Sequence, residues 1–162
     1  MNQPRRISSY LLAWGLWVLS SASGVLIMFW GVYDAIRSVT EILTMGKLVQ
    51  GSSAEQFQVP YTRNAVERFA VLTLGILSVL LVVGIEHFYR TSVGPRQIWQ
   101  RFVGVTAVQL GVLFIALTTQ SVVFAILGLI TIWSVLVPIA VLVAVAALIW
   151  LLNRLSRRPT PT

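Results

Sequence analysis

The longest uncharged stretch of this sequence covers residues 102–153, between Arg101 and Arg154. A helix crosses a bilayer core of about 30 Å with about 20 apolar residues, because it rises about 1.5 Å per residue. The stretch is more than twice as long as one such helix, so the chain must turn back within it. The sequence therefore predicts two antiparallel membrane helices in this region.

The composition extends this interpretation to the whole chain. Of the 162 residues, 57% are hydrophobic and only 10% are charged, whereas soluble domains contain about 25% charged residues. Lipid rather than water must cover such an apolar surplus. We predict an all-α integral membrane protein, a four-transmembrane-helix bundle in a single membrane domain.

The spans follow from the apolar runs and the charges that bound them. The first is expected at about residues 9–33, the second at 65–89, the third at 97–120 and the fourth at 131–153, with a link at 90–96 and a tail at 154–162. A signal peptide is the competing interpretation of the first run, but apolar sequence continues to Val32, too far for a signal. Residues 121–130 would lie along the membrane interface, or the fourth span would begin at Val122 and tilt.

Residues 34–64 form the one sizeable segment expected outside the membrane. Ser38 and Glu41 have the spacing of a capping box, and apolar residues after them recur on one helical face. This pattern predicts a short extracytoplasmic amphipathic helix on the membrane surface. The alternative is that the first membrane helix simply continues into water.

The end of the same segment contains residues that stop or start helices. Residues 51–53 and Pro60 are expected to break any helix that precedes them. Asn64 and Glu67 have the spacing of a second capping box. This box predicts that the second span begins at Ala65.

Basic residues are unevenly divided between the two sides of the predicted bundle. One side carries a single acid, Glu86, and the following arginines: Arg5, Arg6, Arg90, Arg96, Arg101, Arg154, Arg157 and Arg158. On the other side four basic and four acidic residues cancel. The positive-inside rule therefore predicts cytoplasmic termini, and we expect a multi-pass protein of a bacterial inner (plasma) membrane. The net charge of +7 follows the span ends rather than one face, which argues against nucleic-acid binding.

Few residues could carry chemistry. The chain has no cysteine, its acids are scattered and it has no phosphate-binding loop, so we expect no enzyme activity, no metal site and no cofactor. His87, the only histidine, is a weak candidate as an axial ligand for haem or a pigment. Glu86, His87 and Arg90, with Arg96 and Arg101, form the charged corner at which a partner or headgroup could bind. The favoured interpretation is that Phe88, Tyr89 and Arg90 make an ordinary interfacial anchor.

Small residues at helical spacing predict close helix contacts. Ser20 with Gly24, and Ala107 with Gly111, are small-xxx-small pairs, which favour tight packing either within the chain or between copies. Polar membrane residues, among them Gln109, are expected to form hydrogen bonds between helices. Pro138 should kink the fourth span and free the carbonyl group of Ser134, which that residue's own hydroxyl could satisfy.

Three functional hypotheses follow from these observations. The first is a non-catalytic accessory or assembly subunit of a larger membrane complex, whose partners are the bilayer and either other membrane subunits or further copies. The second is a small oligomeric transporter or channel, suggested by the Ser, Thr and Gln content of the spans. The third is a haem or pigment carrier through His87.

Overall fold

The computed structural model describes the backbone of residues 3–91, 95–129 and 131–156, and all regular elements in these ranges are helices. They are α1 (Gln3–Leu26), the π-helix η1 (Ile27–Val32), α2 (Tyr33–Gln50), α3 (Ser53–Arg90), α4 (Pro95–Ile126) and α5 (Ile132–Ser156). The first three are continuous and form one long helix. Four apolar helical segments of the described chain are long enough to cross a membrane: Tyr10–Met45, Gln56–Arg90, Gln97–Ile126 and Ile132–Arg154. The prediction of an all-α multi-pass membrane protein with four spans is confirmed.

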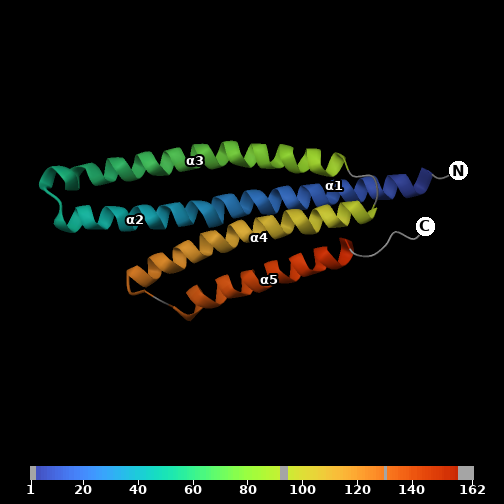
Figure 1. Cartoon of the computed structure of the whole chain (residues 1–162). Coiled ribbons are helices and arrows are strands. Elements are labelled where there is room, and N and C mark those ends of the chain that lie inside the picture. The colour runs from blue at the N-terminus through green and yellow to red at the C-terminus, as the bar shows by residue number, and fades with distance from the viewer. Residues whose placement is uncertain (1–2, 92–94, 130, 157–162) are drawn as a thin grey trace.

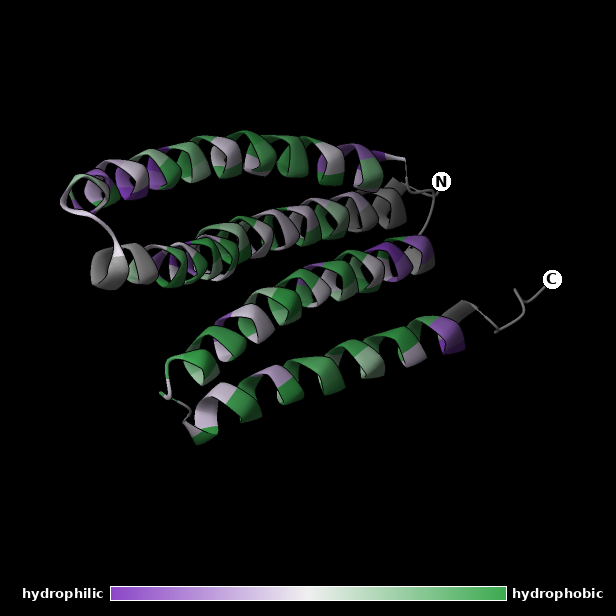
Figure 2. Ribbon diagram, turned by 60° about the vertical axis from the view of Figure 1, so that its left-hand side comes forward, coloured by the Kyte–Doolittle hydropathy of each residue, from purple (hydrophilic) through white to green (hydrophobic). Residues whose placement is uncertain are grey.

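The four long helices, α1–η1–α2, α3, α4 and α5, run antiparallel to one another in chain order (Figure 1). Helices α2 and α3 extend beyond the α4–α5 turn (Figure 1). The α1–η1–α2 helix contacts both α3 and α4, whereas α5 contacts α4 alone among the described elements. Hydrophobic residues fill the middle of the helices, and hydrophilic ones gather toward their ends (Figure 2). The bundle therefore consists of a three-helix core with α5 added at its side.

The segment 34–64 contains no separate short helix, because α2 continues the first helix to Gln50 and α3 already begins at Ser53. The predicted capping hydroxyl of Ser38 instead donates to the carbonyl oxygen of Asp34 at 2.8 Å, a bond made within a helix. The carboxylate of Glu41 accepts from Arg63 on α3 at 2.8 Å. The continuous helix, considered above as the alternative, is what the structure shows.

Helix α3 also differs at its start from the expectation of a helix that begins at Ala65. Pro60 lies inside the helix on its exposed side, where water can satisfy the carbonyl that loses its N–H partner. Glu67 pairs with the guanidinium of Arg63 at 3.1 Å, so the second predicted capping box is not the start of this helix. The hairpin of α2 and α3 is therefore longer than the sequence pattern indicated.

Helix α4 continues through most of the segment expected to lie along the interface, and the chain turns only after Ile126. Gly128 has a φ of 70°, and the N–H of Leu129 bonds to the carbonyl of Phe124 at 2.9 Å. With the bond from the Gly128 N–H to Ala125, this is a Schellman motif, the common way for a helix to end at glycine. The turn between the third and fourth spans is thus fixed by Gly128.

The carbonyl of Ser134, four residues before Pro138, meets a different hydroxyl from the one expected. Ser121 on α4 directs its hydroxyl to this carbonyl, while the hydroxyl of Ser134 donates to Thr131 at 2.6 Å. A proline inside a helix leaves such a carbonyl without its usual N–H donor. The contact between Ser121 and Ser134 therefore satisfies the freed group and joins α5 to α4.

Candidate functional site

Among the described glycines, Gly24 in the first span has the closest neighbours. A Cβ atom built on Gly24 would lie 2.7 Å from Nε2 of Gln109 on α4 and 2.8 Å from Cδ2 of Leu81 on α3. Ser20, one turn earlier, has only 1% of its surface exposed. This predicted small-residue pair therefore packs within the chain and not between copies.

A polar network surrounds this contact. The amide of Gln109 donates from Nε2 to the carbonyl oxygen of Ser20 at 2.7 Å, and its Oε1 lies 3.1 Å from the hydroxyl of Ser23. The hydroxyl groups of Ser20 and Tyr89 are 3.2 Å apart. These bonds join α1 to both α3 and α4, as hydrogen-bonding side chains commonly do inside membranes.

Tyr89 is a residue of this site that the sequence interpretation missed. Together with Phe88 and Arg90 it was expected to anchor the helix end at the interface, but it is 4% exposed and packs in a cluster with Ile85 and Ile98. The available signal was its spacing, because Tyr89 follows Ile85 by four residues and shares its buried face. Aromatic residues at a helix end do not by themselves show which way they point.

The second small-residue pair, Ala107 and Gly111 on α4, makes no comparable contact. A Cβ atom on Gly111 would meet nothing within 4 Å, and Ala107 is half-buried. The two predicted pairs therefore differ: one holds the core and the other leaves space beside it.

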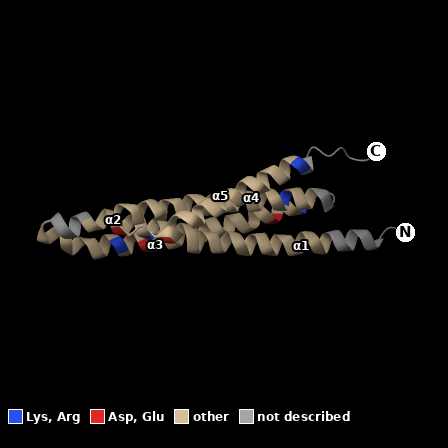
Figure 3. Cartoon of the chain, turned by 90° about the horizontal axis from the view of Figure 1, so that it is seen from below, with Lys and Arg blue, Asp and Glu red and all other residues tan. Residues whose placement is uncertain are grey.

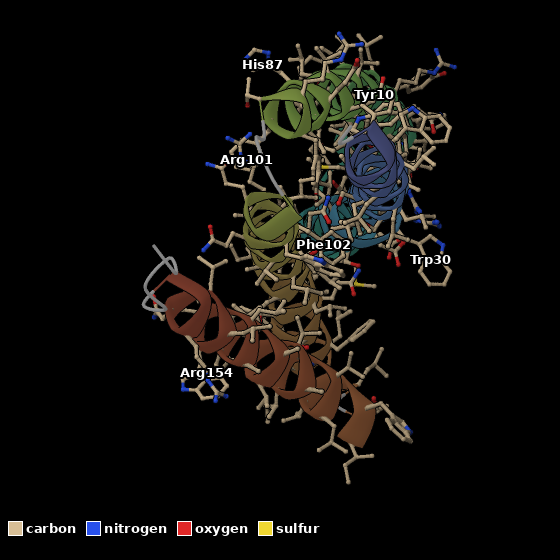
Figure 4. All side chains as sticks on the ribbon, turned by 90° about the vertical axis from the view of Figure 1, so that its right-hand side faces the viewer. Tyr10, Trp30, His87, Arg101, Phe102 and Arg154 are labelled. Atoms are coloured by element: carbon tan, nitrogen blue, oxygen red, sulfur yellow. The ribbon has the colours of Figure 1, made fainter. Side chains whose placement is uncertain are left out.

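The charged corner does not converge on one point. Glu86 and Arg90 pair with each other at 2.9 Å, one turn apart on α3. His87 is exposed and points away from the bundle, apart from Arg101 (Figure 4). The side chain of Arg96 lies outside the described residues.

Arg101 has a structural task in this corner. Its guanidinium donates to the carbonyl oxygen of Phe88 and to the hydroxyl of Thr91, and it stacks 4.6 Å from the ring centre of Phe88. Cations at a helix C-terminus satisfy the last carbonyls and complement the helix dipole. Arg101 therefore caps α3 and holds the start of α4 against it.

The opposite end of the bundle carries a second set of charges, between α2 and α3 (Figure 3). Arg63 contacts both Glu41 and Glu67, and Arg37 lies 3.4 Å from Glu41. These side chains are partly exposed, so each ion pair contributes little stability by itself. These ion pairs instead orient the helices, because the Arg63–Glu41 pair holds α2 beside α3 beyond the apolar region.

The core has two further features, a pair of buried hydroxyl groups and a close approach at Gly31. The hydroxyl groups of Ser21 and Ser78 are buried without a hydrogen-bond partner among the described residues. Gly31, within the π-helix η1, brings the first span close to α4, where its added Cβ would lie 3.1 Å from Leu113.

No group of three potential metal-ligating side chains occurs in the described part of the chain. Comparison with protein-family models, with curated proteins and with solved structures gave no match to this chain.

Proposed function

We propose that this protein is a non-catalytic accessory or assembly subunit of a larger membrane complex. The observation that carries the proposal is the pair of hydrogen bonds made by the buried side chain of Gln109. This amide is the most polar group buried in the spans that the structure describes, and both of its functional atoms bond to α1. Polar groups used in this way make a firm scaffold of three helices rather than the lining of a pathway.

The position of α5 supports the same proposal. Only 6% of its apolar span is buried, against 17–22% for the other three. Since α5 contacts only α4, its other sides are open to lipid or to helices of a neighbouring subunit. A firm core with an open side helix suits a protein that binds other membrane proteins.

We also propose an orientation, with the end that carries Arg101 and Arg154 in the cytoplasm of a bacterium. The excess of arginine at this end supports it through the positive-inside rule. A reporter that is active only in the cytoplasm, fused after Thr162, should be active. Activity only from an externally active reporter at the same position would reverse the orientation.

The test of the subunit role is extraction in a mild detergent, separation on a native gel and mass spectrometry of the band. We expect the chain in a band with other membrane polypeptides, and we expect the Gly24→Val variant, which disturbs the core, to leave that band. The Gly111→Val variant, whose new side chain meets nothing within 4 Å, serves as the matched control.

Other outcomes of this experiment select the competing functions. A band that contains only copies of this chain would replace the proposal with an oligomeric channel or transporter. Visible absorbance in the band, lost in the His87→Ala variant, would replace it with a haem or pigment carrier.

A further inference from the structure

The outer face of α3 differs from its inner face along nearly its whole length. The inner face is buried at Val59, Ala70 and Leu74 against the rest of the bundle. On the opposite side the exposed residues form two rows of members eleven residues apart, which is almost three helical turns: Phe57, Arg68 and Val79, and Tyr61, Leu72 and Val83. Both rows therefore run straight along the helix and form one stripe.

This stripe is longer than the hydrocarbon core of a membrane. From Phe57 to Val83 the helix rises about 39 Å, whereas the hydrocarbon core of a bilayer is about 30 Å thick. Because charged side chains bound a membrane span, we place the edge of the hydrocarbon core near Arg68 and the paired Arg63. The α2–α3 end projects past the α4–α5 turn (Figure 1). Phe57 and Tyr61 lie beyond these charges and are 80% and 76% exposed. With the edge placed at Arg68, lipid chains do not reach these two rings, and exposed aromatic patches outside lipid mark interaction sites.

Two residues on the stripe indicate what covers it. Gly75 lies on the same side of the helix as Phe57, five turns along, and a Cβ added to it would meet nothing within 4 Å. A glycine on an open helix face lets the backbone of another helix approach closely. A helix that lies on Gly75 and continues outward along the stripe would also cover Tyr61 and Phe57.

The exposed Arg68 indicates which charge the partner should carry. It is exposed and makes no ion pair among the described residues, although Arg63 nearby contacts two carboxylates. A second copy of the chain, related by a two-fold axis along the membrane normal, would place Arg68 against Arg68 at this stripe. Glu67, the acid next to Arg68 in the sequence, is already bonded to Arg63. A different protein with a carboxylate at this level fits the face better.

We propose that the face of α3 formed by Phe57, Tyr61, Arg68, Leu72 and Gly75 docks a transmembrane helix of another membrane protein, which carries an Asp or Glu level with Arg68. The helix leaves the bilayer alongside α3 and continues along its projecting end. This inference rests on the proposed subunit role and adds the surface and the kind of partner.

Because the chain contains no cysteine, each site can be tested with one introduced thiol. The variants Phe57→Cys, Tyr61→Cys and Leu72→Cys, labelled with a benzophenone maleimide, are irradiated in native membranes. The control is Leu43→Cys on α2, whose residue is 69% exposed. We expect all three α3 sites, and not Leu43, to give adducts with one and the same membrane protein, mapped along a single helix of it that carries an acidic residue.

Substitutions on the stripe then test its two special residues. Arg68→Glu should lower the adduct yield at Phe57→Cys by about tenfold, and Arg68→Lys should retain it. Gly75→Leu should lower the yield to a similar extent, whereas Gly84→Leu, off the stripe and also without neighbours within 4 Å, should not. Unchanged thermal unfolding of all four variants in detergent is the control for folding.

Several results would overturn the inference. An adduct with the mass of two copies would assign the face to self-association. Adducts with lipid alone, or equal reaction of Phe57→Cys with a membrane-impermeant maleimide in native membranes and after purification, would show that no protein covers it. If the chain migrates with other subunits on a native gel but gives no adduct, only this face is wrong. If it migrates alone, the proposed subunit role fails as well.

Discussion

The fourth span and the first span show opposite relations between hydrophobicity and burial. Helix α5 is the most apolar of the four, yet only 6% of its span is buried. The first span contains Ser20, Ser21 and Ser23 and packs against both α3 and α4. In a soluble protein the order would be reversed, because water drives the most apolar helix to the centre.

This difference shows which interactions hold a helix in place inside a membrane. Lipid is as apolar as leucine, so apolar side chains gain little by leaving it. Close approach at Gly24 and the bonds of Gln109 provide specific attraction, and these residues are the ones in the core. Helix α5 packs against α4 alone among the described elements, and Leu152 lies 3.8 Å from a Cβ added to Gly104.

The sharpest way to break this comparison is to fill the space at Gly24. Gly24→Val would displace the ends of the Gln109 and Leu81 side chains, and a displaced Gln109 loses its bond to Ser20, so we expect a loss of about 2 kcal/mol of unfolding free energy. Gly111→Val adds the same side chain where nothing lies within 4 Å and should cost far less. Denaturation by SDS, followed by circular dichroism, measures both. Equal losses would show that Gly24 is not a packing site.

A second test compares leucines of the two regions. Leu74 on α3 is 3% exposed and Leu142 on α5 is 48% exposed. Leu74→Ala should leave a cavity and cost about 2 kcal/mol. Leu142→Ala should change the unfolding free energy by less than about 0.5 kcal/mol, as exposed substitutions usually do. A large loss for Leu142→Ala in membranes but not in detergent would indicate that a partner covers α5.

The number and type of helices could be predicted from the sequence because an apolar run long enough to cross a bilayer has few other possible structures. The ends of the helices could not. The capping-box spacing at Ser38 occurs inside a continuous helix, where the hydroxyl bonds to Asp34. Pro60 looked like a helix breaker because its exposed position depends on how α3 packs.

The site was predictable to the extent that its residues are small or polar. The pair Ser20 and Gly24 was found by its spacing, and Gln109 by its chemistry. Tyr89 was missed, because its partner Ser20 is far away in the sequence and only the fold brings them together. Arg101 caps α3, whereas His87 points outward (Figure 4). Which of the two side chains meets the helix end likewise depends on the turn between α3 and α4.

The polar network offers a test that separates a scaffold from a channel. Gln109→Leu removes the bonds to Ser20 and Ser23 and should cost about 1 to 1.5 kcal/mol of unfolding free energy. In a double-mutant cycle with Ser23→Ala, the two losses should be less than additive, because they share one bond. Thr118→Leu, at an exposed position of α4, is the control. Loss of conductance in reconstituted bilayers, with stability unchanged, would favour a channel instead.

The smallest predicted effect concerns the hydrogen bond that Ser121 on α4 donates to the Ser134 carbonyl on α5. Ser121→Ala removes the hydroxyl that meets the Ser134 carbonyl, and we expect a loss of about 0.6 kcal/mol, the average for such bonds in membranes. The loss depends on Pro138, which leaves that carbonyl without an N–H donor. In a Pro138→Ala background the restored N–H should satisfy the carbonyl, so Ser121→Ala should then cost almost nothing. An equal loss in both backgrounds would mean that Ser121 acts through its bond to Leu117 within α4 and not through its contact with α5.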